Sequence, residues 1–239
     1  MPSVATLRRQ VRDADAAYRR GAAVMTDAQF DALTRQLRDA APFAPELQHP
    51  GGGSKLLSLD NGDDEELEMW LDSCGAQEPL CVQEKVDGCA IAIRYVDGLL
   101  EAAWTRSGRD ATALVQRVAP SQLASPVSIE VRGELYDAAT GRQSVPAQAL
   151  RKANPPGEGL AFIAYTLVDA QSNEFDTLWL LQVFGFDVVS SIACGNISEV
   201  VSCHRAWKAG AFGRTELPTD GIVMRIADHE TQRKLGSST

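Results

Sequence analysis

The chain has 239 residues, a hydrophobic fraction of 44% and a formal charge of -9 at pH 7. This length excludes a small disulfide-stapled scaffold, and no stretch reaches the roughly 18 uncharged apolar residues of a membrane span. The negative charge has the wrong sign for a protein that holds a polyanion unaided, so composition by itself indicates no nucleic-acid partner.

The N-terminus and the cysteines point to a reducing compartment. Charges begin at Arg8 and no apolar signal-peptide core precedes them, which predicts a cytoplasmic protein without a membrane partner. The five cysteines are odd in number and form no C-x-x-C pair. This pattern argues against a disulfide framework and against a zinc knuckle, and it favours reduced thiols.

The first 40 residues are predicted to form two helices. Apolar residues recur at helical spacing in two runs, Leu7, Val11, Ala14 and Tyr18 in the first and Phe30, Leu33 and Leu37 in the second. Thr26 followed by Gln29 fits a capping box at the start of the second helix. The segment 41–53, rich in proline and glycine, predicts a connector that ends a small helical subdomain.

Strands dominate the rest of the chain. After a predicted helix at 63–71, the segment 80–105 alternates between polar and apolar residues, and Asp97-Gly98 suits a two-residue hairpin turn. Later elements are a half-buried strand over 127–134, a central buried strand over 160–168, helices over 174–184 and 197–208, and a short strand over 222–226. The pattern predicts an α+β domain with a largely antiparallel sheet and flanking helices.

Lys85 draws attention because it lies in Glu84-Lys85-Val86-Asp87-Gly88, where a strand enters a tight turn. Taken alone, a lysine on the polar face of a strand is usually solvated, and K-x-D-G is short enough to arise by chance. Other short segments accompany it at plausible separations along the chain. Ser58-Leu59-Asp60-Asn61 precedes Lys85. After Lys85 come Thr105-Arg106, Val131-Arg132-Gly133-Glu134, the strand around Tyr165, and Asp220-Gly221-Ile222-Val223-Met224-Arg225.

Together these segments resemble the nucleotidyltransferase, or adenylation, domain of the NAD-dependent DNA ligases of bacteria and some of their phages. The resemblance covers nearly the whole chain, although several of its motifs are shared with ATP-dependent ligases and capping enzymes. The segment from Thr26 to Leu33 resembles the helical subdomain that closes over the nicotinamide mononucleotide half of NAD. The resemblance implies a covalent nucleotidyltransferase fold over residues 54–239, preceded by a helical subdomain and linker over residues 1–53.

The resemblance also implies a mechanism. In this family a lysine, here Lys85, attacks the α-phosphorus of NAD to give a lysyl-adenylate, which then passes to the 5′-phosphate of a DNA nick during replication and repair. An ordinary lysine is protonated at neutral pH, so the amine must first lose a proton. Asp87 would orient the lysine or the metal. Mg²⁺ would be bound mainly through phosphates and water, so no protein metal cage is expected.

Binding roles follow from the same resemblance. Gln83 falls where the family has an adenine-contacting glutamate, Tyr165 where an aromatic ring stacks beneath adenine, and Arg225 where a lysine contacts the α-phosphate. Arg106 and Glu134 match positions that bind the ribose in this family. The remaining assignments are Ser58 and Leu59 ahead of the adenosine pocket, Asp220 in the last motif, and Tyr18, Asp27, Phe30 and Asp31 on the nicotinamide side.

The match has departures that leave alternatives open. Gln83 lacks the charge of a glutamate, Arg225 cannot exchange a proton as a lysine can, and Phe30 stands where tyrosine is usual. The sequence ends before a further motif and the OB-fold of the family, so we expect self-adenylation alone, with nicked DNA engaged through further domains or a partner chain. The alternatives are an impaired nucleotide-binding or assembly subunit of a split ligase and an ATP-dependent RNA ligase or capping-type enzyme.

Taken without the resemblance, Asp27 and Asp31 fit a solvated helix face, where acids near the N-terminus are favoured by the helix dipole. The resemblance shifts both toward a role in nicotinamide binding.

Overall fold

The computed structural model describes residues 3–19, 24–25, 27–40, 62, 64–74, 79–152, 157–168, 170 and 172–235. The chain divides into two compact units, residues 1–58 and residues 59–237. Each unit is described by itself. The predicted connector, Thr26 of the predicted capping box, and Ser58 and Leu59 lie outside the described residues.

The first unit contains the two predicted helices, α1 (Val4–Arg19) and α2 (Asp27–Ala40). Both are amphipathic, and their apolar stripes bury Leu7, Val11 and Leu37 against each other. Phe30 and Leu33 are partly buried and pack on this small core. The two helices predicted from the 3.6-residue period are therefore confirmed.

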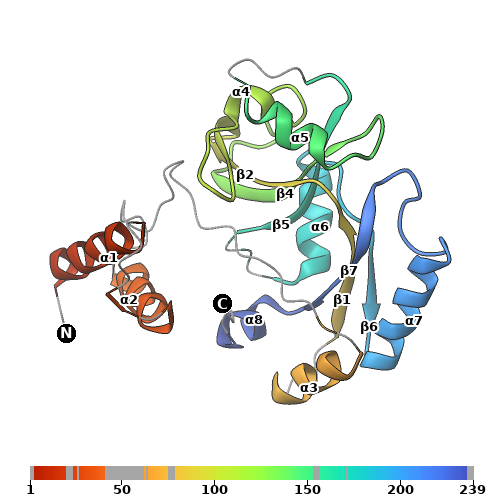
Figure 1. The fold of residues 1–239 in the computed structure, drawn as a ribbon, viewed down its shortest axis with the longest axis horizontal. Coiled ribbons are helices and arrows are strands. Elements are labelled where there is room, and N and C mark those ends of the chain that lie inside the picture. The colour runs from red at the N-terminus through yellow and green to blue at the C-terminus, as the bar shows by residue number, and fades with distance from the viewer. Residues whose placement is uncertain are drawn as a thin grey trace. The chain divides into compact units, whose positions relative to one another are not determined.

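The second unit is built on two antiparallel sheets (Figure 1). The three-stranded sheet has the order β6-β1-β7, and the four-stranded sheet has the order β3-β2-β4-β5. The strands are β1 (Leu80–Val86), β2 (Cys89–Val96), β3 (Leu99–Thr105), β4 (Ile129–Asp137), β5 (Leu160–Leu167), β6 (Ser191–Cys194) and β7 (Thr219–Ile226).

Helices flank these sheets, and those predicted over 63–71, 174–184 and 197–208 are among them. They are α3 (Asp64–Cys74), α4 (Thr112–Val115), α5 (Ser144–Ala149), α6 (Glu174–Val183), α7 (Ile197–Lys208) and α8 (His229–Leu235). The caps of α6 and α7 are Asn173 and Asn196, whose side chains accept from the amides of Asp176 and Glu199. Among the described helices, none has the length and apolar character that crossing a membrane requires.

The passage from β1 to β2 places Lys85 at a junction. β1 is the middle strand of one sheet, and two residues later the chain enters β2 of the other sheet. β2 then turns back through Asp97 and Gly98, whose φ angles of 49° and 78° suit the predicted two-residue hairpin. Lys85 thus lies at the end of a strand, directly before the chain changes sheets.

One strand lies elsewhere than predicted. Because residues 160–168 are apolar on both faces, the sequence predicts a central strand, but β5 is the edge of the four-stranded sheet. Its outer edge is covered instead by residues 187–189, since Ala164 bonds to the backbone of Asp187 and Val189. The α6 helix packs on β5 as well. Burial of β5 was predicted correctly, and only its place in the sheet was wrong.

Candidate functional site

Lys85 is held at the end of β1 by a carboxylate of β7. Its Nζ donates to Oδ1 and Oδ2 of Asp220 at 2.8 and 2.7 Å. Lys85 lies opposite Gly221 in the sheet, and the ladder shifts register between Lys85 and Val86. The pair leaves the lysine about one third exposed. This arrangement presents an amine at the surface with a proton acceptor beside it.

The turn after Lys85 requires its glycine. A Cβ at Gly88 would lie 2.3 Å from the carbonyl oxygen of Leu135 and 3.1 Å from Cγ of Glu134. The amide of Asp87 donates to the carbonyl of Pro218 at 2.7 Å, which ties the turn to the segment before β7. The K-x-D-G spacing therefore brings the lysine of one sheet against the R-G-E strand of the other.

Charged groups from three strands and from the turns after β1 and β3 converge here. Burial raises the pKa of Asp87, and the nearby Asp220 carboxylate raises it further while Lys85 opposes the rise. Burial also raises the pKa of Glu134 to about 8, although the cation of Arg106 pulls it down. Glu134 is therefore largely protonated at neutral pH in this state.

Glu134 gives the site a pH signature. The pKa of Glu134 in the folded protein is about 8, which is higher than the pKa of an unfolded glutamate. The raised pKa therefore contributes folding stability that is fully present below the unfolded pKa and is lost as pH rises through 8. Glu134→Gln mimics the protonated form. The variant should match the wild type near pH ~5 and exceed its stability near pH ~9, by on the order of a few kcal/mol. Thermal unfolding of both proteins across this range measures the difference, and a difference independent of pH would refute the assignment.

Tyr165 and Arg225 lie on another side of the site, where Glu134 and Arg106 act electrostatically on the Tyr165 hydroxyl. The guanidinium carbon of Arg225 lies 5.7 Å from the centre of the Tyr165 ring, within the range of a cation–π contact. Burial raises the pKa of the Tyr165 hydroxyl to about 12. The sequence assigned Arg225 to a phosphate, whereas the structure places its Nη1 3.3 Å from Oε1 of Glu174.

Glu174 is a residue that the sequence analysis missed. It is fully buried at the start of α6, where the sequence pattern predicts only the first turn of a helix. Its Oε1 accepts from Nε2 of Gln232 at 2.9 Å and lies 3.5 Å from Nε2 of His229. Burial opposes ionisation, but His229, Arg225 and Gln232 together hold the pKa of Glu174 below its usual value. A buried carboxylate therefore restrains the arginine of the last motif.

Removing Glu174 should be costly. Glu174→Ala leaves the partly buried Arg225 without its counter-charge, and breaking such a pair costs about 3 kcal/mol. Urea unfolding should show that loss, and the double variant Glu174→Gln/Arg225→Met should recover part of it because no charge is then left unpaired. Equal stability of Glu174→Ala and wild type would show that the Glu174–Arg225 pair does not stabilise the fold.

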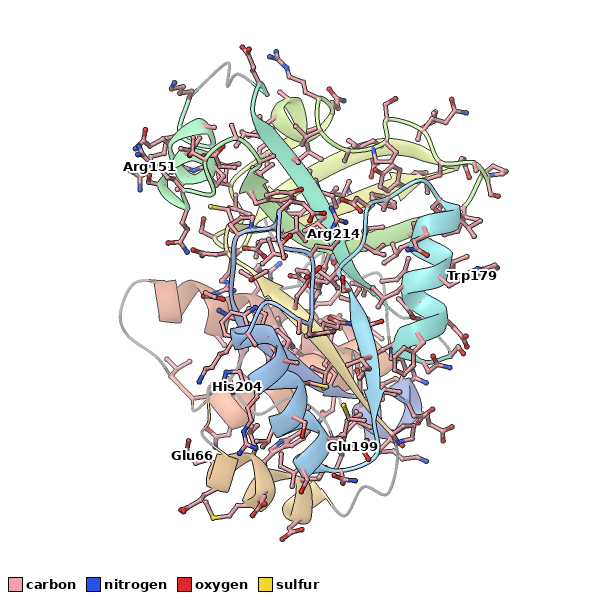
Figure 2. All side chains as sticks on the ribbon, turned by 90° about the vertical axis from the view of Figure 1, so that its right-hand side faces the viewer. Glu66, Arg151, Trp179, Glu199, His204 and Arg214 are labelled. Atoms are coloured by element: carbon pink, nitrogen blue, oxygen red, sulfur yellow. The ribbon has the colours of Figure 1, made fainter. Side chains whose placement is uncertain are left out.

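Two residues beside Lys85 differ sharply in their surroundings. Gln83, on the same strand face as Lys85, is almost fully buried, and its Nε2 lies 3.8 Å from Sγ of Cys81. Glu84 points to the other face, where its oxygens accept from the amides of Ser190 at 2.9 Å and Arg214 at 2.7 Å. Glu84 thus anchors the segment around Arg214 (Figure 2) to the lysine strand, a role that the sequence did not reveal.

The predicted nicotinamide side is described less fully. Tyr18 lies on α1 and Asp27 and Asp31 lie on α2, with side chains outside the described part of the structure. Phe30 packs on the core of the two helices. Within the described residues, no three histidine, cysteine or acidic side chains cluster as metal ligands.

The chain is similar in sequence to known DNA ligases. Residues 44–157 match the family model of the NAD-dependent DNA ligase adenylation domain. The chain is 26% identical to a DNA ligase of Paracoccus denitrificans, over 97% of this chain and 38% of that protein. It is 28% identical to a DNA ligase of Thermotoga maritima, over 90% of this chain and 39% of that protein. The chain thus spans about two fifths of the length of these relatives.

A solved structure described as Pmar-Lig_PreS3 shares the fold. It aligns with 87% of this chain and 48% of its own, with a TM-score of 0.52 and 7% identity. At that identity the likeness concerns the fold alone. Together with the antiparallel sheets, it confirms the predicted α+β class.

Proposed function

We propose that this chain is the adenylation module of an NAD-dependent DNA ligase and that Lys85 is its nucleophile, because residues 44–157 match the family model of that adenylation domain. The observation that carries the proposal is the Lys85–Asp220 pair at 2.7 Å. It lies at the junction of two sheets, where Asp87, Arg106 and Glu134 also meet. This grouping supports a single site that offers an amine, a proton acceptor and groups for a nucleotide.

The proposed step transfers adenylate from NAD to Lys85. The ammonium first gives up one proton, for which Asp220 is the adjacent acceptor. The Nζ–Pα bond forms while the Pα–O bond to the second phosphate breaks, and the electron pair leaves on the phosphate of nicotinamide mononucleotide. The nitrogen then loses its second proton. One NAD yields one lysyl-adenylate, one nicotinamide mononucleotide and two protons.

The surrounding residues suit the adenosine half of the substrate. Tyr165 presents a ring to the base, and Gln83 offers an amide where a hydrogen bond to adenine is expected. Arg106 and Glu134 would bind the ribose hydroxyls. Arg225 would contact the α-phosphate after its contact with Glu174 loosens, because its guanidinium now faces that carboxylate and the Tyr165 ring.

Mg²⁺ and the nicotinamide side complete the proposal. Asp87 and Asp220 repel each other electrostatically, and a cation shared with substrate phosphates would relieve that repulsion. Asp87 would hold the ion, which would neutralise phosphate charge. Ser58 and Leu59 are proposed to adjoin the adenosine pocket, and Tyr18, Asp27, Phe30 and Asp31 to contact the nicotinamide mononucleotide half.

The adenylate is proposed to pass to the 5′-phosphate of nicked double-stranded DNA, with further domains or a partner chain holding the duplex. DNA ligases of bacteria are the relatives of this chain, and bacterial DNA lies in the cytoplasm. We therefore propose cytoplasmic action in DNA replication and repair.

A single-turnover assay tests the proposal. Chromatography of the purified chain incubated with Mg²⁺ and equimolar NAD should show release of close to one nicotinamide mononucleotide per chain. Release with ATP as the only productive nucleotide would instead favour an ATP-dependent nucleotidyltransferase. Binding of NAD without release would favour an impaired nucleotide-binding subunit.

A further inference from the structure

A basic pocket lies beside the lysine site, in a part of the second unit that the proposed adenylation step does not use. Its volume is about 340 Å³. The lining includes Arg109, Arg151 and Lys152, together with Asp110, Thr112 and Leu150. All three cations are exposed, and Figure 2 shows Arg151 on the outside of the molecule. A local excess of positive charge is notable in a chain with a net charge of -9.

The pocket is held together by contacts between distant segments. The amide of Thr105 donates to the carbonyl of Arg109 at 2.9 Å, which closes the turn after β3. Nη1 of Arg109 donates to the carbonyl of Leu150 at 3.4 Å, at the end of α5. This bond joins the turn to the segment that carries Arg151 and Lys152. The three cations therefore share one folded surface.

The single carboxylate in the lining does not cancel this charge. Oδ1 of Asp110 accepts from the amide of Thr112 at 2.9 Å, so it is engaged at the start of α4. Hydrogen bonds from Thr112 lower the pKa of Asp110, which is therefore ionised at neutral pH. Three cations against one anion leave a net positive pocket.

Two lining residues, Arg109 and Arg151, relate the pocket to the surroundings of the proposed nucleophile. Arg109 lies in the same turn as Arg106, whose charge acts on Glu134. Arg151 also acts electrostatically on the thiol of Cys89, the residue directly after the K-x-D-G turn. Glu134 and Asp87 raise the pKa of that thiol, and Arg151 lowers it. The basic pocket and the lysine site are thus neighbours along the same end of the four-stranded sheet.

We infer that this pocket binds a phosphate of a nucleic-acid strand whose end is presented to the lysine site. The inference rests on the proposed function, which supplies the reason for a strand to approach. Guanidinium groups match phosphate oxygens in pairs, and a cavity of this size admits a phosphodiester linkage. An acidic protein needs such a local cationic surface to approach a polyanion at all.

The test measures binding of a fluorescent nicked duplex with a 5′-phosphate, by anisotropy, as a function of salt. Arg151→Gln/Lys152→Gln and Arg109→Gln are compared with Arg205→Gln/Lys208→Gln, a matched pair of exposed cations in the last turn of α7. The pocket variants should bind the duplex about tenfold more weakly, with a salt slope reduced by about one per lost phosphate contact, and the α7 pair should bind like the wild type. Thermal unfolding of each variant verifies that it is folded.

The KM for NAD in self-adenylation distinguishes a nucleic-acid phosphate from a phosphate of the dinucleotide. A raised KM with unchanged duplex binding would overturn the inference in favour of the dinucleotide. Equal effects of the pocket and α7 variants, or no salt-dependent binding by the wild type at low salt, would also overturn it. Failure of the proposed function has a separate signature, because the wild type would then take up no adenylate from NAD whatever the duplex result.

Discussion

Replacing Lys85 by alanine is expected to abolish transfer of adenylate from NAD to the chain. The variant lacks the only atom proposed to form a bond to the α-phosphorus, so the rate should fall on the order of a thousandfold or more. The Lys85–Asp220 pair is partly exposed, and such pairs add at most about 1 kcal/mol of stability. The variant should therefore remain folded. Transfer of label from adenine-labelled NAD to protein, followed on a denaturing gel, measures the rate.

Lys208→Ala is the matched control, because it removes an exposed lysine near the end of α7. It should be labelled as fast as the wild type. Continued labelling of Lys85→Ala at the wild-type rate would move the nucleophile to another residue.

Replacing Gly88 by alanine should damage both stability and activity. The added Cβ would lie 2.3 Å from the carbonyl oxygen of Leu135, and the backbone of β4 cannot yield without disturbing its pairing with β2. Overpacking of this kind costs about 1–3 kcal/mol, which lowers Tm by roughly 2–12 °C in a protein of this size. Glu134 directly precedes Leu135 in β4 and would be displaced with it. Labelling by NAD should therefore also be slower than in the wild type, even at temperatures well below the new Tm.

Gly195→Ala supplies the comparison for Gly88→Ala. A Cβ at Gly195 would meet nothing closer than 3.8 Å, at an oxygen of Glu199. Tm and labelling should both stay at wild-type values. An unchanged Tm in Gly88→Ala would show that the turn accommodates a side chain and that the two sheets are not locked there.

Local patterns predicted much of the fold correctly. The alternation along 80–105 and the Asp97-Gly98 turn depend only on residues close together in sequence, because strand periodicity and turn preferences act over a few positions. The position of β5 was wrong because apolar faces report burial without saying what buries them. Here the covering backbone comes from residues 187–189, which only the folded chain brings to that edge.

The candidate site shows the same division. The order of the motifs suggested that Lys85, Glu134 and Arg225 act together, and the structure shows what the sequence spacing hid. Arg225 meets Glu174, 51 residues away in sequence. Arg109 meets Leu150, 41 residues away. Sequence periodicity does not reveal such contacts, because they depend on the register of the sheet and on where the following helix packs.

Intact-mass spectrometry after incubation with Mg²⁺ and NAD, ATP or neither nucleotide tests the central claim most directly. The account predicts a mass gain of one adenylate with NAD alone. A gain with ATP alone would contradict the NAD assignment, and no gain with either nucleotide would contradict Lys85 as a working nucleophile in this chain.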